Sequence, residues 1–238
     1  MTFCIGIKVA DGLVGLSDTR VTSGVEYSSA PKTTIIQREF HSMFIMTSGL
    51  RSTRDKALTY FNEVMESDDK NFDRLYVAVN KFSEQVRRVR TEDQEALTEG
   101  GYKFDLTCII GGQLENDKEH KLYMLYPEGN WVEAAEDSPF YVIGVSAYGK
   151  PILRRVLTYQ SSLAIALKLC FLAFDSTRVS ANDVDYPIDV LHYKKDSYSL
   201  IEHRFETSDL RPISKWWQNV LKRAVSRMPS DWIRTFTE

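Results

Sequence analysis

Short apolar runs separated by turn signals mark the beginning of the chain. Much of both faces of residues 3–9 (F-C-I-G-I-K-V) is apolar, and an Asp-Gly pair, typical of tight hairpin turns, separates them from residues 13–17. Residues 33–37 and 43–47 form a second such pair of runs. We therefore expect two antiparallel pairs of strands before the first helix.

The period of the apolar positions then changes from that of a strand to that of a helix. In residues 50–66 the apolar side chains recur at helical spacing, at Ala57, Leu58, Phe61, Val64 and Met65. Residues 72–89 repeat the pattern, and a polar, glycine-containing segment then runs to about residue 102. The pattern predicts two consecutive amphipathic helices followed by a loop.

The second half of the chain repeats this order of strands followed by helices. Four strand patterns occupy residues 105–111, 121–126, 131–134 and 140–143, and a helical region runs from residue 149 to about residue 174 as one or two helices. Two more strands, at residues 188–193 and 199–205, precede a closing helix from residue 208 to about residue 227. No repeat or proline-rich linker divides the chain, so we expect a single domain over residues 1–238.

This order of elements indicates the fold class. Strands and helices each come in pairs, which differs from the strict alternation of a parallel α/β fold. Two stacked sheets with a layer of helices outside each would bury every apolar stripe found above. We therefore predict an α+β protein, a four-layer αββα sandwich.

Composition and charge exclude several classes of function. The chain of 238 residues is 43% hydrophobic and 26% charged, with a formal net charge of −3, so nothing draws it toward nucleic acid or an anionic membrane surface. The longest apolar run, residues 156–174, is interrupted by polar residues including Lys168, which favours a buried helix over a membrane span. No secretory leader opens the sequence, so we expect a cytoplasmic protein.

The cysteines and histidines point away from metal and disulfide chemistry. Cys4, Cys108 and Cys170 are odd in number and lie in apolar segments, as expected for reduced core residues. The four histidines are isolated, and no glycine-rich phosphate loop follows a strand. We therefore expect no metal, cofactor or nucleotide site in this chain.

A reactive constellation can be assembled around Thr2. If Met1 is removed, the hydroxyl of Thr2 stands beside its own α-amine, and an α-amine with a pKa of about 7.7–8.0 suits a general base. Asp18 ends the neighbouring strand and Lys32 enters the next one, so both can approach Thr2. A lysine there would favour the alkoxide, and a carboxylate would orient the lysine. Gly49, at a strand-to-helix junction, offers a backbone N–H to an oxyanion.

Several segments carry a family resemblance. The opening T-F-C-I-G-I with the following D-G-L-V-G-L-S-D-T-R, the T-S-G before a helix, and the later I-G-V-S-A-Y-G-K-P-I-L, F-D-S-T and P-I-D-V-L resemble a proteasome β-type subunit. More closely, they resemble the bacterial Anbu (ancestral beta subunit) family of proteasome-type peptidases, in order over nearly the whole chain. The resemblance implies an N-terminal-nucleophile hydrolase fold and a threonine peptidase for peptide or protein substrates. It also implies a homo-oligomeric ring or open spiral, and it leaves room for an unidentified ATPase partner.

The resemblance assigns roles to the same residues. It makes Thr2 the nucleophile, Asp18 the conserved aspartate, Lys32 the active-site lysine and Gly49 the oxyanion glycine. The spacing from Lys32 to Gly49 is longer than in typical proteasome β subunits, so we expect different loops around the specificity pocket. Met1 stands directly before Thr2 in the sequence, so we expect no long propeptide and expect removal of Met1 alone to free the amine.

Supporting residues are also implied. Ser146 corresponds to the serine beside the threonine amine, and Asp175 corresponds to the supporting aspartate at the end of the long helix. The second supporting serine is either Ser176 or Ser180, and the sequence leaves both open.

Ordinary structural roles remain open beside these. Thr2 can be an ordinary N-terminal residue, Asp18 a turn former and Lys32 a solvated loop lysine. Three functions follow: a threonine hydrolase of peptide bonds, a proteasome-like scaffold without catalysis, and an amidase for a non-peptide amide. The joint presence of all three residues favours the enzyme.

The outer helices are expected to make contacts between subunits. Four of their aromatic residues are predicted to be exposed: Phe72, Tyr76, Trp216 and Trp217. The closing helix combines its two tryptophans with basic residues, so we expect it to pack on the outer sheet or against a neighbouring subunit.

Overall fold

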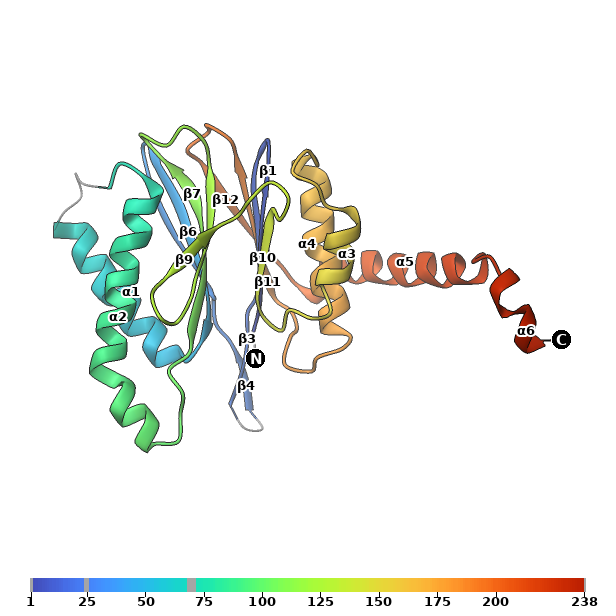
Figure 1. Cartoon of the computed structure of the whole chain (residues 1–238), viewed down its shortest axis with the longest axis horizontal. Helices are drawn as coiled ribbons and strands as arrows, with labels where there is room; N and C mark the ends of the chain where they lie inside the picture. Colours follow the sequence, from blue (N-terminus) through green and yellow to red (C-terminus); the bar gives the residue numbers. More distant parts are fainter. Residues whose placement is uncertain (1, 24–25, 68–71, 238) are drawn as a thin grey trace.

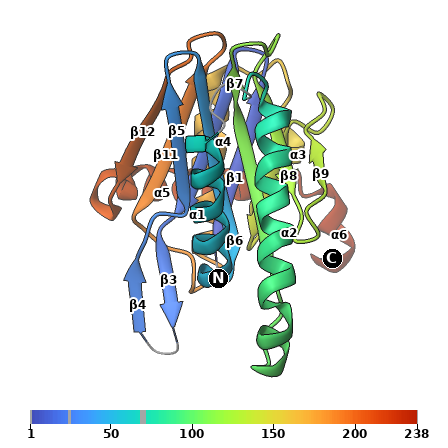
Figure 2. The same ribbon diagram turned by 90° about the vertical axis from the view of Figure 1, so that its left-hand side faces the viewer.

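Two antiparallel five-stranded sheets lie at the centre of the protein (Figure 1 and Figure 2). The structure, a computed structural model, describes residues 2–23, 26–67 and 72–237. The first sheet has the strand order β10-β1-β2-β11-β12, with β1 Phe3–Val9, β2 Gly12–Asp18, β10 Phe140–Gly144, β11 Ile188–Lys194 and β12 Leu200–Phe205. The second has the order β5-β6-β7-β8-β9, with β5 Thr33–Arg38, β6 His41–Gly49, β7 Leu106–Leu114, β8 Lys121–Leu125 and β9 Trp131–Glu133.

Each sheet carries a pair of helices on its outer face (Figure 1). Helices α1 (Arg51–Ser67) and α2 (Leu75–Glu99) cover the second sheet, and helices α3 (Lys150–Val156) and α4 (Leu163–Arg178) cover the first. The two sheets are stacked between these helices. The α+β class is confirmed, and the helical region predicted from residue 149 forms two helices.

Alternation along β1 explains how this strand joins two cores. Phe3 and Ile5 belong to the buried cluster formed with α3 and α4, whereas Cys4 belongs to the cluster between the two sheets. Gly6 points to the same side as Cys4, and a side chain at Gly6 would overlap Ile109 of β7. Glycine at this position therefore lets the two sheets approach closely.

Two parts of the fold differ from the sequence prediction. Helix α2 continues past the predicted end at Val89 as far as Glu99, and the helix stops at Gly100. This part of α2 is held by packing of Leu97 on the buried cluster and by ion pairs of Glu92 and Asp93 with α1. A two-stranded ribbon, β3 (Arg20–Ser23) and β4 (Glu26–Ser29), was not predicted, because its short polar strands show no apolar alternation. The ribbon follows directly on the end of β2.

The predicted exposed aromatics are partly corrected. Phe72 is only 7% exposed, because its ring packs edge-on against Phe61 at a centroid distance of 6.2 Å. Tyr76 and Trp216 are exposed, as predicted, and Trp217 is half-buried.

The closing helix projects from the body of the protein (Figure 1). This helix, α5 (Thr207–Ser226), has no buried residue, and η2 (Asp231–Ile233) and α6 (Arg234–Thr237) follow it. Its first turns touch the body, through Leu210 and Ser214 among others. Of the two packing partners expected for this helix, the outer sheet is therefore wrong, and a neighbouring subunit stays a prediction. No helix in the described part of the chain has the length and apolar character needed to cross a membrane.

Burial of His120 predicts a pH dependence of stability. Its side chain is fully buried before β8, and its Nε2 lies 2.7 Å from the Val9 carbonyl oxygen. Burial, together with the charges of Lys8 and Lys195, lowers the pKa of His120 below its usual 6.5, although Val9 and Glu119 act in the opposite direction. The folded state therefore favours the neutral imidazole, and the stability it contributes is present above pH 6.5 and is lost as the pH falls through the folded-state pKa.

Replacement of this histidine is expected to remove that dependence. His120→Gln should flatten the fall of the unfolding temperature between about pH 7 and about pH 5, as measured by thermal unfolding. His203→Gln, which changes an exposed histidine on β12, should leave the fall unchanged. Equal slopes in the wild type and His120→Gln would show that another group causes the dependence.

Candidate active site

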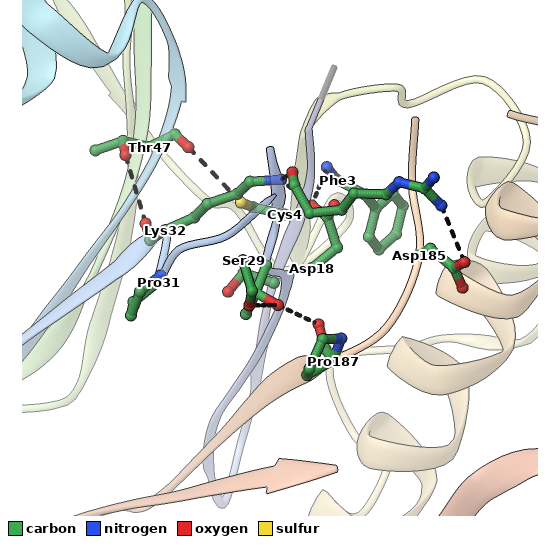
Figure 3. Close-up of polar contacts among 12 residues, drawn as sticks. Phe3, Cys4, Asp18, Ser29, Pro31, Lys32, Thr47, Asp185 and Pro187 are labelled. Carbon is green, nitrogen blue, oxygen red and sulfur yellow. Dashed lines mark hydrogen bonds and ion pairs between the residues drawn. The ribbon is translucent and has the colours of Figure 1, made fainter. Parts of the chain in front are cut away.

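A buried ion pair lies where the two sheets meet, at the end of β2 (Figure 3). The Nζ of Lys32 donates to Oδ1 of Asp18 at 2.6 Å and to the Arg20 carbonyl oxygen at 2.7 Å. The backbone N–H of Phe3 donates to the same Oδ1 at 2.8 Å. The side chains of Lys32 and Asp18 are 5% and 0% exposed, so the pair is shielded from water.

The electrostatics of this pair are costly for the fold. Burial raises the pKa of the Asp18 carboxyl above its usual 3.8, and Lys32 and the Phe3 N–H oppose that rise. Oδ2 of Asp18 is buried and has no hydrogen-bond partner among the described residues. Because desolvation offsets much of what a buried ion pair gains, such a pair is weak evidence for a stabilising role and directs attention to chemistry.

The register of the first sheet places Thr2 beside this pair. Cys4 is paired with Ser17, so the chain before Phe3 passes the end of β2 at Asp18. The carbonyl oxygen of Thr2 accepts a hydrogen bond from the Val145 N–H at 2.7 Å. Thr2 is half-buried between the ends of β2 and β10. Met1, whose removal would free the amine of Thr2, lies outside the described residues.

Gly144 allows β10 to approach Thr2 closely. It has a φ of +78°, and a side chain there would overlap the Thr2 carbonyl oxygen. Ser146, the predicted neighbour of the threonine amine, follows Val145 and is half-buried, so the structure brings it to the same end of the sheet.

Gly144→Ala is therefore expected to disturb the site. Displacement of Thr2 by about 1 Å would lower the acylation rate of Thr2 by roughly 10²-fold. Gly101→Ala is a matched control, because Gly101 has a similar φ of +77° and open space around its Cβ position. Labelling by an electrophile that reports acylation should fall only in the first variant. Equal labelling rates in the two variants would mean that the contact does not position Thr2.

Gly49 occupies the predicted junction between a strand and a helix. It is the last residue of β6, two residues before α1 begins at Arg51. Its φ is +132°, and a side chain would overlap the Asp105 carbonyl oxygen. Two residues earlier, the Thr47 N–H donates to the Lys32 carbonyl oxygen at 3.0 Å. The structure therefore brings Gly49 to the strand end that carries Lys32.

Asp175 makes different contacts from those of the ion pair. It lies in α4, is 5% exposed, and its Oδ1 accepts from Nη2 of Arg178 and Oγ of Ser214, each at 2.8 Å. Ser180 is exposed, and its hydroxyl donates to the Ser176 carbonyl oxygen at 3.0 Å. The polar contacts of Asp175 in the described part of the chain are thus made with its own helix and with α5, and none is made with Thr2.

Cys4 is the other nucleophilic side chain next to the pair. Its thiol donates to the Thr47 carbonyl oxygen at a sulfur–oxygen distance of 3.9 Å, and it is fully buried. Burial raises the pKa of the Cys4 thiol, so the reactive thiolate is disfavoured. Thr2 is therefore preferred to Cys4 as the nucleophile candidate.

Sequence reasoning missed two contributors to this arrangement. The Arg20 carbonyl oxygen, which accepts a hydrogen bond from Lys32, belongs to the unpredicted ribbon. Every residue has a backbone carbonyl, so the identity of residue 20 could not indicate this contact. Gly144 could have been found, because a glycine between an apolar strand and a serine often marks a close backbone approach. Within the described residues, no group of three His, Cys, Asp or Glu side chains is placed to hold a metal ion.

Comparison with known proteins identifies the family. No protein-family model and no curated protein matches the sequence. Among solved structures, Anbu (ancestral beta-subunit) from Yersinia bercovieri is 29% identical, with a TM-score of 0.88 over 96% of this chain and 98% of that one. The structure called the helical assembly of the Anbu complex, from Pseudomonas aeruginosa, is 30% identical, with a TM-score of 0.90 over 96% of this chain and 98% of that one. The chain belongs to the Anbu family.

A third Anbu structure supports the same assignment. The Gly-1 mutant of Anbu from Hyphomicrobium sp. strain MC1 is 30% identical, with a TM-score of 0.87 over 96% of this chain and 99% of that one. The predicted family is thereby confirmed, and with it membership in a proteasome-related group of proteins. Because 96% of the chain is matched in all three, the sheets and the helices that cover them belong to one shared architecture.

Proposed function

We propose that this Anbu protein is an N-terminal-nucleophile threonine hydrolase that cleaves peptide bonds. The observation that carries the proposal is the buried Lys32–Asp18 pair, bonded to the N–H of Phe3 and therefore one residue from Thr2. The stacked sheets between two helix layers are the arrangement expected of the N-terminal-nucleophile class. In this proposal removal of Met1 frees the amine of Thr2.

The proposed chemistry assigns one task to each group. An ammonium has three N–H donors, and the bonds of Lys32 to Asp18 and Arg20 use two of them. The third stabilises the Oγ of Thr2 as it loses its proton to the α-amine. Asp18 fixes the lysine, and the N–H of Gly49 near the start of α1 stabilises the oxyanion.

The reaction then proceeds in two steps. Oγ of Thr2 attacks the carbonyl carbon of the substrate, the C–N bond breaks, and the leaving amine takes the proton held by the α-amine. Water then attacks the ester, the α-amine accepts a proton from that water, and the proton returns to Oγ as the carboxylic acid product leaves. Ser146, beside the main chain of Thr2, is proposed to orient the amine.

A second candidate, a proteasome-like scaffold without catalysis, is favoured by one observation. The carboxylate of Asp175 contacts Arg178 and Ser214, so its predicted support of the Thr2 amine has no counterpart among the polar contacts of the described residues. If that support is essential, the threonine would be present but slow. Hydrolysis of a non-peptide amide would use the same residues with a different pocket.

Self-assembly is part of the proposal. The Pseudomonas aeruginosa relative is a helical assembly, and this chain exposes aromatic residues such as Tyr76 and Trp216 that suit contacts between copies. A repeated head-to-tail contact gives a ring if the rotation closes and a helix if it does not. Light scattering at micromolar concentration should show species well above the 27.4 kDa of one chain, and a stable monomer would contradict self-assembly.

Intact mass and hydrolysis together test the proposed function. Mass spectrometry of the protein purified from cells should show the loss of one methionine, and the processed chains should hydrolyse members of a peptide-amide library. Fully processed chains that hydrolyse neither peptide amides nor simple non-peptide amides would favour the scaffold.

A further inference from the structure

A cleft lies between α4 and the first turns of α5, on the outside of the helix layer. It has a volume of about 190 Å³. Its lining includes Arg178 of α4, Tyr186 of the segment before β11, and Arg211, Ser214 and Lys215 of α5. We call it the α4–α5 cleft. It is the place where the projecting helix α5 leaves the body, so a ligand there would touch both parts.

The charged residues that line the α4–α5 cleft are all cationic. Arg178 is paired with the buried Asp175, which does not line the cleft itself. Arg211 and Lys215 have no ion-pair partner among the described residues, and like charges four positions apart on a helix disfavour it. Asp175 balances the charge of Arg178, and the positive charges of Arg211 and Lys215 are not balanced by an ion pair within the described part of the chain.

Two buried polar atoms in the cleft residues lack partners. Nε of Arg178 and the hydroxyl of Tyr186 are buried and form no hydrogen bond within the described residues. Buried polar atoms without a partner in the chain are rare in folded proteins, so these two atoms point to a partner from outside the chain. Arg178 is also held in place, by Asp175, by Ser214 and by the face of Tyr186, whose ring centre lies 5.5 Å from its guanidinium carbon.

These observations fit one kind of ligand. We propose that the α4–α5 cleft binds a small phosphate-type oxyanion. Arginine guanidinium groups form strong charge-assisted bonds with such anions. The N-terminus of α5 is capped by the carboxylates of Glu206 and Asp209, so the attraction comes from the cationic side chains of the cleft and not from the helix dipole. The bound anion would join Arg178 on α4 to Arg211 and Lys215 on α5. It would thereby fix the direction in which α5 projects, independently of any hydrolase activity.

Calorimetric titration of the full-length protein with inorganic phosphate tests this proposal. At constant ionic strength set with chloride, the wild type should bind one phosphate per chain with a saturable heat. Arg211→Gln combined with Lys215→Gln should weaken binding by at least about tenfold. Tyr186→Phe should weaken it several-fold. Lys222→Gln combined with Arg223→Gln removes the same charge from the exposed far part of α5 and should leave binding unchanged.

Three results would overturn the proposal. The first is no saturable heat with the wild type. The second is equal weakening by both double variants, which would show that phosphate responds only to the general charge of α5. The third combines two observations: the wild type does not bind phosphate, and Arg211→Gln combined with Lys215→Gln loses self-association in light scattering. The cleft would then hold an acidic side chain of a second copy.

Discussion

Replacing Thr2 by alanine is expected to abolish hydrolysis, lowering kcat/KM by roughly 10⁴-fold or more. Alanine keeps the α-amine but lacks the oxygen that attacks the carbonyl carbon. The neighbouring thiol of Cys4 is fully buried and cannot take its place. Because Thr2 is a half-buried residue at the start of a strand, the unfolding free energy should change by less than about 0.5 kcal/mol. Hydrolysis rates and thermal unfolding of the two proteins measure these effects.

Thr2→Ser is the matched control for this experiment. Serine keeps both a hydroxyl and the adjacent amine, so this variant should retain measurable hydrolysis. Activity of Thr2→Ala equal to that of the wild type would place the nucleophile elsewhere.

Lys32 and Asp18 are expected to act as one unit. Lys32→Ala and Asp18→Asn should each slow the acylation of Thr2 by about 10²–10⁴-fold, because either change leaves the hydroxyl without an oriented ammonium. The double variant should be about as slow as either single variant, since the second change removes a group that has already lost its function. Rates of labelling by an epoxyketone, which reacts with the hydroxyl and the amine of an N-terminal threonine, provide the measurement.

Stability gives an independent test of the same pair. Removing one partner of a buried ion pair leaves the other uncompensated and costs about 3–5 kcal/mol, whereas removing both costs less than the sum. Denaturant unfolding of the single and double variants should therefore show strong coupling. Additive losses in both rate and stability would mean that Asp18 and Lys32 work independently and that the geometry described above has no functional meaning.

The sheets and their helices could be predicted because buried faces require apolar residues at the period of a strand or a helix. In β1 both faces are covered, Phe3 by the helices and Cys4 by the second sheet, so the strand is apolar except at Lys8. The last turns of α2 could not be predicted from the period of apolar residues. After Val89 the apolar stripe continues only at Leu97, which packs on the buried cluster. Ion pairs of Glu92 and Asp93 with Lys56 of α1 hold this part of the helix, and such pairs leave no apolar period in the sequence.

The candidate site was predictable where it depends on strand pairing. A hairpin brings Asp18 back to the start of β1, and Lys32 stands before the next strand, so their meeting follows from local topology. The contacts of Asp175 did not follow, because its partner Ser214 comes 39 positions later on a helix that leaves the body. Which groups share a helix surface across such a distance depends on tertiary packing and leaves no mark in local sequence pattern.

The most direct test of the central claim is the position of an epoxyketone adduct in the wild-type protein purified from cells. Peptide mapping by tandem mass spectrometry should find the added mass on the N-terminal peptide that begins with Thr2, with both its hydroxyl and its amine modified. The amount of adduct should equal the fraction of chains that have lost Met1. An adduct on any other residue, or fully processed chains that remain unlabelled, would contradict the assignment of Thr2 as the nucleophile.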